Sequence, residues 1–139
     1  INSSYMIVSS NISLIKNFID LEFRDYNEFK KNEKSELVKE KDYNMYYKEF
    51  ERLGKIYEKM AHNFKNTGDL QTSLNLFKLA SLLYNESGII RQKCQEVFYN
   101  ADSNIKKFNN HILAYKNCYD RYSRCHNNYE KIKNNLLIK

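Results

Sequence analysis

Two long stretches of the chain carry apolar residues in alternating steps of three and four, and this spacing limits the possible folds more than any other feature. The first stretch contains Tyr43, Tyr46, Phe50, Leu53, Tyr57, Met60 and Phe64. The second contains Cys94, Phe98, Ala101, Ile105, Phe108, Ile112, Tyr115, Tyr119 and Tyr122, and continues to Leu136. Residues at these intervals share one face of an α-helix, and a heptad repeat is typical of long helices packed lengthwise. With no proline and three glycines, the chain has too few turn-forming residues for an all-β fold.

We therefore predict an all-α fold of long antiparallel helices in a coiled-coil-like bundle. The main reversal is expected near residues 85–88, because Asn85-Glu86-Ser87-Gly88 has the composition of a turn. The second stripe then predicts one helix of about 48 residues, roughly 70 Å long. Residues 1–11 are expected to be a linker, residues 12–139 the helical domain, and residues 12–29 an amphipathic helix.

A helix of that length cannot bury its stripe alone, so the sequence predicts a homodimer or a heterodimer. The residues expected in the core or dimer stripe are Phe98, Ile105, Phe108, Ile112, Tyr115, Tyr119 and Tyr122. The tyrosines could instead stack on nucleic-acid bases beside nearby cations, but their heptad register favours packing. We expect no nucleic-acid partner.

The net charge of +6 is concentrated in the last third of the chain. Residues 1–42 sum to −1, residues 43–87 to +1 and residues 88–139 to +6. A basic end suits nucleic acid, an anionic membrane or an acidic protein, and charge alone does not choose among them. The apolar runs are far shorter than the roughly 20 residues that a membrane-spanning helix needs.

No motif for chemistry stands out, so we expect no enzymatic activity, no cofactor and no small-molecule substrate. The sequence contains neither G-x-x-x-x-G-K-[ST] nor G-x-G-x-x-G, the glycine patterns of phosphate-binding loops. Cys118 and Cys125 are seven residues apart, roughly 10 Å along a helix, which is too far for a disulfide or a shared zinc ion. The cysteine count fits a reducing compartment, and we expect a cytoplasmic protein.

Residues 77–105, FKLASLLYNESGIIRQKCQEVFYNADSNI, resemble the corner between the first two helices of the BAR domains of sorting nexins. Residues 111–132, HILAYKNCYDRYSRCHNNYEKI, look like a later part of the second helix in that family. The resemblance covers about residues 12–135, and the third long helix of the family is missing from it.

The resemblance implies a dimeric scaffold that binds anionic, curved endosomal membrane, including phosphoinositides, during protein transport. The membrane-binding cations would be Lys93, Lys106, Lys107, Lys116, Arg121, Arg124, Lys131 and Lys133. The membrane-inserting residues would be Ile12, Ile15, Phe18 and Ile19. The protein would then be peripheral to the membrane.

Residues 57–87 also look like one tetratricopeptide repeat, which implies a helical adaptor that binds a partner peptide. In that alternative Thr67-Gly68-Asp69 is a sharp turn, whereas in the BAR alternative Gly68 lies inside a continuous helix. The backbone at Gly68 therefore separates the two hypotheses.

Overall fold

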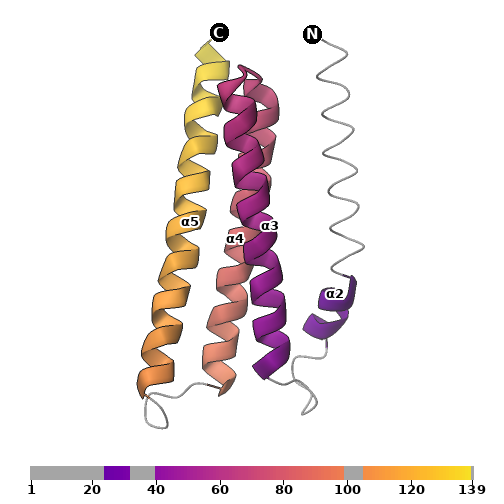
Figure 1. The fold of residues 1–139 in the computed structure, drawn as a ribbon, viewed down its shortest axis with the longest axis vertical. Helices are drawn as coiled ribbons and strands as arrows, with labels where there is room; N and C mark the ends of the chain where they lie inside the picture. Colours follow the sequence, from indigo (N-terminus) through magenta and orange to yellow (C-terminus); the bar gives the residue numbers. More distant parts are fainter. Residues whose placement is uncertain (1–23, 32–39, 99–104, 139) are drawn as a thin grey trace.

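The computed structural model describes residues 24–31, 40–98 and 105–138, and its regular elements in these ranges are all α-helices. They are α2 (Arg24–Lys31), α3 (Glu40–Asn66), α4 (Leu70–Phe98) and α5 (Ile105–Ile138). Figure 1 shows α3, α4 and α5 side by side as an elongated group of helices aligned lengthwise, with the short α2 beside α3. The predicted all-α class and the bundle-like packing of long helices are confirmed.

The chain reverses at Gly68, where glycine adopts the left-handed conformation with φ of 87°. The Gly68 amide donates to the Lys65 carbonyl and the Asp69 amide to the Phe64 carbonyl, which is the Schellman pattern that ends a helix. Asp69 then caps α4, because its carboxylate accepts bonds from the Thr72 amide at 3.1 Å and the Thr72 hydroxyl at 2.7 Å. The sharp turn of the tetratricopeptide alternative is therefore present, and the expectation of the BAR alternative that Gly68 lies inside a continuous helix is wrong.

The hairpin of α3 and α4 holds the main apolar core. From the first predicted stripe, Tyr43, Phe50, Leu53 and Tyr57 are buried, and the other members pack partly against the same core. The helices approach closely at Gly54, where a Cβ would lie 2.8 Å from the Tyr84 ring. One turn from the reversal, the buried Ser73 hydroxyl donates to the Ala61 carbonyl at 2.7 Å. The periodicity of this stripe thus correctly predicts the buried face of α3.

The helix α5 returns along α4 in the opposite direction (Figure 1). Arg91 of α4 contacts His111 near the start of α5. Gly88 lies about one turn before Arg91 on α4, and it packs against Cys118, which lies two turns after His111 on α5. The buried residues of α5 are His111, Cys118, Cys125 and Ile132, which are spaced by seven. This line is the face with which α5 joins the core.

The predicted reversal at residues 85–88 is wrong, because these residues lie inside α4. The Ser87 hydroxyl donates to the Tyr84 carbonyl at 2.6 Å, a bond within the helix, so it caps no new one. Glu86 pairs with Lys30 at 2.7 Å and accepts a hydrogen bond from Tyr26 of α2. Gly88 is buried under α5, with Cys118 Cβ 3.5 Å from where its own Cβ would be. Glu86 and Gly88 therefore serve contacts between helices, whereas Ser87 bonds within its own helix.

The predicted helix of about 48 residues is also wrong, because α4 ends at Phe98 and α5 begins at Ile105. The apolar stripe has nearly the same register before and after residues 99–104. Both α4 and α5 carry it because each helix packs an apolar face against the other. Periodicity alone could not reveal that α5 runs in the opposite direction to α4.

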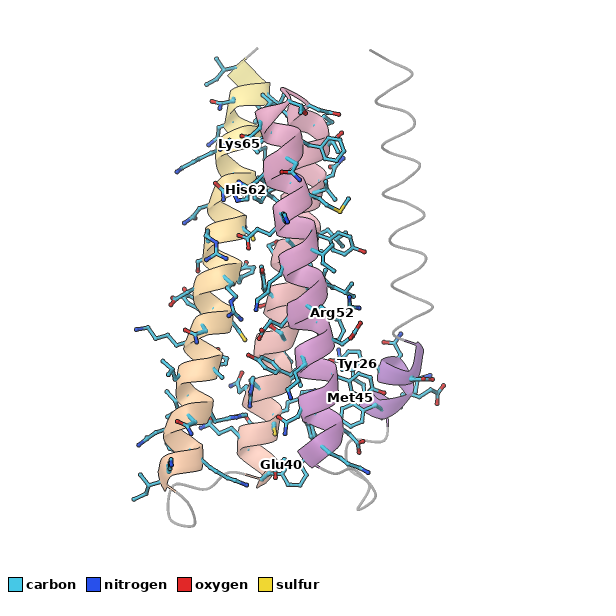
Figure 2. The ribbon with its side chains drawn as sticks, viewed as in Figure 1. Tyr26, Glu40, Met45, Arg52, His62 and Lys65 are labelled. Carbon is cyan, nitrogen blue, oxygen red and sulfur yellow. The ribbon has the colours of Figure 1, made fainter. Side chains whose placement is uncertain are left out.

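The helix α2 docks on α3 through aromatic rings. Tyr26 lies 4.9 Å from Phe50 and 5.1 Å from Tyr46 between ring centroids, and Figure 2 shows Tyr26 between the two helices. The predicted linker 1–11, and the predicted membrane-inserting residues Ile12, Ile15, Phe18 and Ile19, lie outside the described residues. In the described part of the chain, we find no helix that is long and apolar enough to cross a membrane.

Candidate functional site

The side of the bundle opposite α4 is formed by α3 and α5, which are joined there by ion pairs. Lys107 lies 3.9 Å from Glu40, Arg121 lies 3.1 Å from Glu51, and Arg124 lies 2.7 Å from Glu58. The residue numbers rise together on both helices, so α3 and α5 run parallel to each other. Long side chains rather than close backbone packing therefore connect these two helices.

Glu58 is the most extensively bonded member of this set. Arg124 donates Nε to Oε2 at 2.7 Å and Nη2 to Oε1 at 2.9 Å, a bidentate pair. The Tyr84 hydroxyl from α4 donates to the same carboxylate at 3.0 Å. Burial alone would raise the pKa of Glu58, but the bonds from Arg124, Cys125 and Tyr84 outweigh it and lower that pKa. Glu58 thus stays ionised and ties all three long helices together.

Glu51 forms a second, similar centre one heptad earlier on α3. Burial opposes its ionisation, but hydrogen bonds from Tyr47 and Lys55 and the charge of Arg121 lower its pKa. Burial, followed by the bond to Glu51, raises the pKa of Tyr47. Arg91 of α4 lies over the Tyr47 ring at 4.0 Å from the centroid. Both glutamates are therefore neutralised by cations of neighbouring helices.

A row of exposed cations follows α3 along the edge that faces solvent. We call it the α3 ridge; it consists of Lys41, Lys48, Arg52, Lys55 and Lys59. Its steps of seven, four, three and four keep these residues on one face of the helix, over about 27 Å. At 100° per residue the acidic residues of α3 fall on its two flanks instead. The acids on the flanks still reach two ridge cations, because Arg52 pairs with Glu49 and Lys55 pairs with Glu51 at 2.9 Å.

The α3 ridge and part of α5 border a common cleft of about 450 Å³. The residues that line this cleft are Lys55, Glu58, Lys59, His62, Asn63 and Arg124. Figure 2 shows Arg52 near the middle of α3, with His62 and Lys65 above it towards the upper end of the helix. We call the α3 ridge, this cleft and the adjoining edge of α5 the basic face.

The eight cations predicted to bind membrane are divided among several sides of the molecule. Lys107, Arg121 and Arg124 point towards α3 and form the ion pairs described above. By helical position, Lys106 and Lys131 lie on the same side, at the outer edge of α5. Lys93 belongs to α4, and Lys116 and Lys133 lie on the other side of α5; the Lys133 ammonium is 5.8 Å from the Tyr129 ring centroid.

The predicted stripe, which runs from Phe98 of α4 to Tyr122 of α5, is only partly covered within this chain. Phe98, Phe108 and Tyr122 are half-buried, whereas Ile105, Ile112, Tyr115 and Tyr119 are exposed. The line that enters the core is displaced by one position around the helix, at His111, Cys118, Cys125 and Ile132. The exposed residues remain a predicted contact for another helix.

The α3 ridge was missed from the sequence because charge was summed over segments. Residues 43–87 sum to +1, which hides that cations and acids lie on different faces of one helix. A helical projection of the charged residues, like that used for the apolar ones, would have revealed the ridge.

The cysteines and His111 serve packing in this structure. All three cysteines are free and buried, and burial, followed by the nearby Glu58 carboxylate, raises the pKa of Cys125. The His111 Nδ1 accepts from Arg91 at 2.8 Å, which leaves its proton on Nε2, bonded to the Arg91 carbonyl. Within the ranges that the structure describes, no three histidine, cysteine or acidic side chains gather as metal ligands would.

Comparison with known proteins leaves the chain without an assigned family: no family model, no curated protein and no solved structure matches it.

Proposed function

We propose that this chain is a non-enzymatic helical scaffold that binds an anionic membrane surface through its basic face. The observation that carries the proposal is the α3 ridge, five exposed cations on one straight helix edge. Each lysine or arginine near an anionic bilayer contributes about 1 kcal/mol. Arg52 and Lys55 are already paired with Glu49 and Glu51, so the ridge supplies less than five such contributions, on the order of a few kcal/mol at low ionic strength.

The shape of the basic face favours an extended surface over a small ligand. Its cations are spread over about 27 Å, and the cleft beside them is shallow and open to solvent. Arg121 and Arg124 already neutralise Glu51 and Glu58, so the acidic residues between the helices do not repel an anionic partner. Location at the endosome, and a role in protein transport, rest on the sorting-nexin resemblance alone.

The test compares two triple charge reversals that change the net charge equally. Lys48→Glu, Arg52→Glu and Lys59→Glu remove ridge cations, whereas Lys93→Glu, Lys116→Glu and Lys133→Glu remove cations from other sides. We expect the ridge variant to lose binding to liposomes with anionic lipid by about 100-fold or more, from roughly 1 kcal/mol per cation. The control variant should retain most of it. Equal binding of the wild type to neutral and anionic liposomes would disprove the proposal.

A nucleic acid is the competing polyanion. Electrophoretic shifts with single-stranded and duplex DNA, titrated with salt, measure that affinity on the same proteins. Tighter binding to DNA than to anionic liposomes at equal salt would replace the membrane with a nucleic acid as the partner.

A peptide-binding adaptor is a second candidate, and the reversal at Gly68 favours it. Against it, α3 and α4 have 27 and 29 residues, whereas the tetratricopeptide alternative requires two short helices. If the protein binds a peptide and has no affinity for anionic liposomes, the result would favour the adaptor.

A further inference from the structure

The side of the bundle that α2 covers stays apolar past the first residue of α2. Figure 1 shows α2 beside the lower part of α3, and α3 extends from there to the reversal at Gly68. By helical position, the apolar residues of this further part face the same side as the residues that contact α2. We call them the strip, and they are Leu53, Ile56, Met60 and Phe64 of α3 with Leu79 and Leu82 of α4. Ile56 is 41% exposed and Leu82 is 52% exposed, so the strip has apolar area left to bury.

The direction of α2 shows where the chain before it leads. Between ring centroids, Tyr26 lies 4.9 Å from Phe50, and Phe29 lies 5.0 Å from Tyr43. Residue numbers therefore rise along α2 as they fall along α3, so the two helices are antiparallel. A helical continuation of α2 towards lower numbers would run along the strip and end near Phe64.

The sequence before α2 continues the spacing of its contact face. The residues that share this spacing are Ile12, Ile15, Ile19, Phe23 and Tyr26, separated by steps of three, four, four and three. In a helix, these steps place the four apolar residues on the same face as Tyr26, which is buried. Residues 12–23 thus carry an apolar face in the orientation that α2 already uses.

We infer that residues 12–23 pack on the strip as a helix, in line with α2 and antiparallel to α3. As a helix, the segment from Ile12 to its last residue is about 16 Å long, which is also the length of the strip along α3. The contacts of α2 set the register, which places Ile19 at the level of Ile56 and Ile15 at the level of Met60. The register therefore pairs apolar residues with apolar residues.

Attachment to α2 favours this segment over a separate molecule. The helix α2 is held on the bundle by the ring contact of Tyr26 with Phe50 and by the Lys30–Glu86 ion pair at 2.7 Å. Phe23 adjoins the first residue of α2, so the segment starts at the edge of the strip. Its docking is intramolecular, whereas a second copy or a lipid loses translational freedom when it binds there. The segment therefore has the advantage over either competitor.

Docking gives the segment a different role from the one that the sorting-nexin resemblance implies. The resemblance assigns Ile12, Ile15 and Ile19 to membrane insertion, and docking turns these side chains towards the strip instead. The strip lies on the side of α3 and α4 that carries α2, whereas the basic face lies on the side of α3 and α5. The inference is thus independent of the proposed function, and docking leaves the basic face open.

Hydrogen exchange tests the docking in the full chain without lipid. Amides of residues 12–23 should exchange at least about tenfold more slowly than in an unstructured chain, because packing protects their helical hydrogen bonds. Ile56→Asp should remove most of this protection, because it places an unpaired carboxylate against apolar side chains. Leu113→Asp is the matched control, since Leu113 is 58% exposed on α5. Exchange at the unstructured rate in the wild type, or equal protection in the two variants, would overturn the inference.

A substitution in the segment itself repeats this test from the other side of the contact. Ile15→Asp should remove the protection of residues 12–23 while α4 and α5 keep theirs, which shows that the bundle remains folded. Asn17→Asp makes the same charge change on the opposite face of the segment and should retain the protection. Protection that appears only at high protein concentration would assign the strip to a second copy and contradict the docking.

Disulfide formation tests the register. A chain with Ile15→Cys and Met60→Cys should form an intramolecular disulfide on mild oxidation, because the two positions lie at one level. A chain with Ile15→Cys and Leu113→Cys is the control and should form its disulfide at least about tenfold more slowly. Equal rates, or disulfides that link two chains instead, would show that the segment does not lie on the strip.

Liposome binding separates docking from membrane insertion. Because a docked segment stays out of the bilayer, Ile15→Asp and Asn17→Asp should bind anionic liposomes equally, within about twofold. A loss of about tenfold or more in Ile15→Asp alone would assign residues 12–23 to the bilayer and overturn the inference. Failure of the wild type to bind liposomes, with residues 12–23 protected, would reject the proposed function and support the docking.

Discussion

The central helix α4 meets its two neighbours in different ways. Against α3 it packs closely through shape, with Gly54 accommodating the Tyr84 ring and Ala61 lying fully buried. Against α5 it has a looser fit at Gly88, supplemented by the His111–Arg91 contact and by the arginines that reach α3. The difference teaches that the α3–α4 hairpin depends on volume, whereas the attachment of α5 depends to a larger degree on charge and protonation.

The largest expected effect comes from adding one methyl group where α3 and α4 touch. Gly54→Ala should destabilise the protein by about 2–3 kcal/mol, because the new Cβ would lie 2.8 and 2.9 Å from carbons of a buried ring. Urea unfolding followed by circular dichroism measures the change in free energy. A stability equal to that of the wild type would show that Tyr84 moves freely and that shape does not dominate this interface.

The next effect concerns the polar attachment of α5. Glu58→Ala should cost about 1–2 kcal/mol, because it leaves Arg124 and the Tyr84 hydroxyl without their shared acceptor. Arg124→Ala should cost less, since the Arg124 side chain is 53% exposed. A double-mutant cycle gives the coupling energy, and additive effects of the two substitutions would contradict a direct interaction.

The matched glycine on the other side of α4 should respond in the opposite direction. Gly88→Ala should stabilise the protein by about 0.5–1 kcal/mol, because alanine favours a helix interior and its Cβ would meet Cys118 at an ordinary 3.5 Å. The same unfolding measurement checks it. Destabilisation as large as that of Gly54→Ala would remove the contrast between the two interfaces.

The smallest expected effect is a loss of stability in mild acid. Burial, followed by the positive charge of Arg91, lowers the pKa of His111 from its usual 6.5 despite the bond to the Arg91 carbonyl. The unfolded chain therefore binds a proton more readily, so stability should decrease as pH falls below 6.5 and level off below the folded pKa. Glu51 and Glu58 contribute only at lower pH, below about 4.5. His111→Gln should flatten the dependence between pH 6.5 and 5, and an unchanged slope would assign it to another group.

The sequence predicted helices and their buried faces better than their ends. The stripe from Tyr43 to Phe64 gave the core face of α3, because packing and periodicity agree there. The turn predicted at residues 85–88 is wrong because serine and glycine also occur inside helices. Here the Ser87 hydroxyl bonds to its own helix, and Gly88 lets α5 pack closely. The tetratricopeptide alternative placed a turn at Gly68, and the BAR alternative placed Gly68 inside a helix. The sequence allows both, and the left-handed backbone at Gly68 decides for the turn.

The candidate site was harder to predict than the fold. Arg121 and Arg124 were expected to face a membrane, but their partners Glu51 and Glu58 are about 66–70 residues earlier in the chain, and no local pattern connects them. The α3 ridge, in contrast, has a local signal in the spacing of Lys48, Arg52, Lys55 and Lys59. Contacts between distant segments thus set the limit on what single-sequence analysis can find.

The position of two thiols gives the molecule an internal reporter. Cys118 and Cys125 are 1% and 0% exposed, both on the line by which α5 joins the core. A thiol-directed reagent can modify them only when α5 separates from its neighbours. The rate of labelling at these two thiols, counted apart from Cys94 of α4, therefore measures how often α5 detaches. Adding liposomes shows whether a bilayer slows or hastens that detachment.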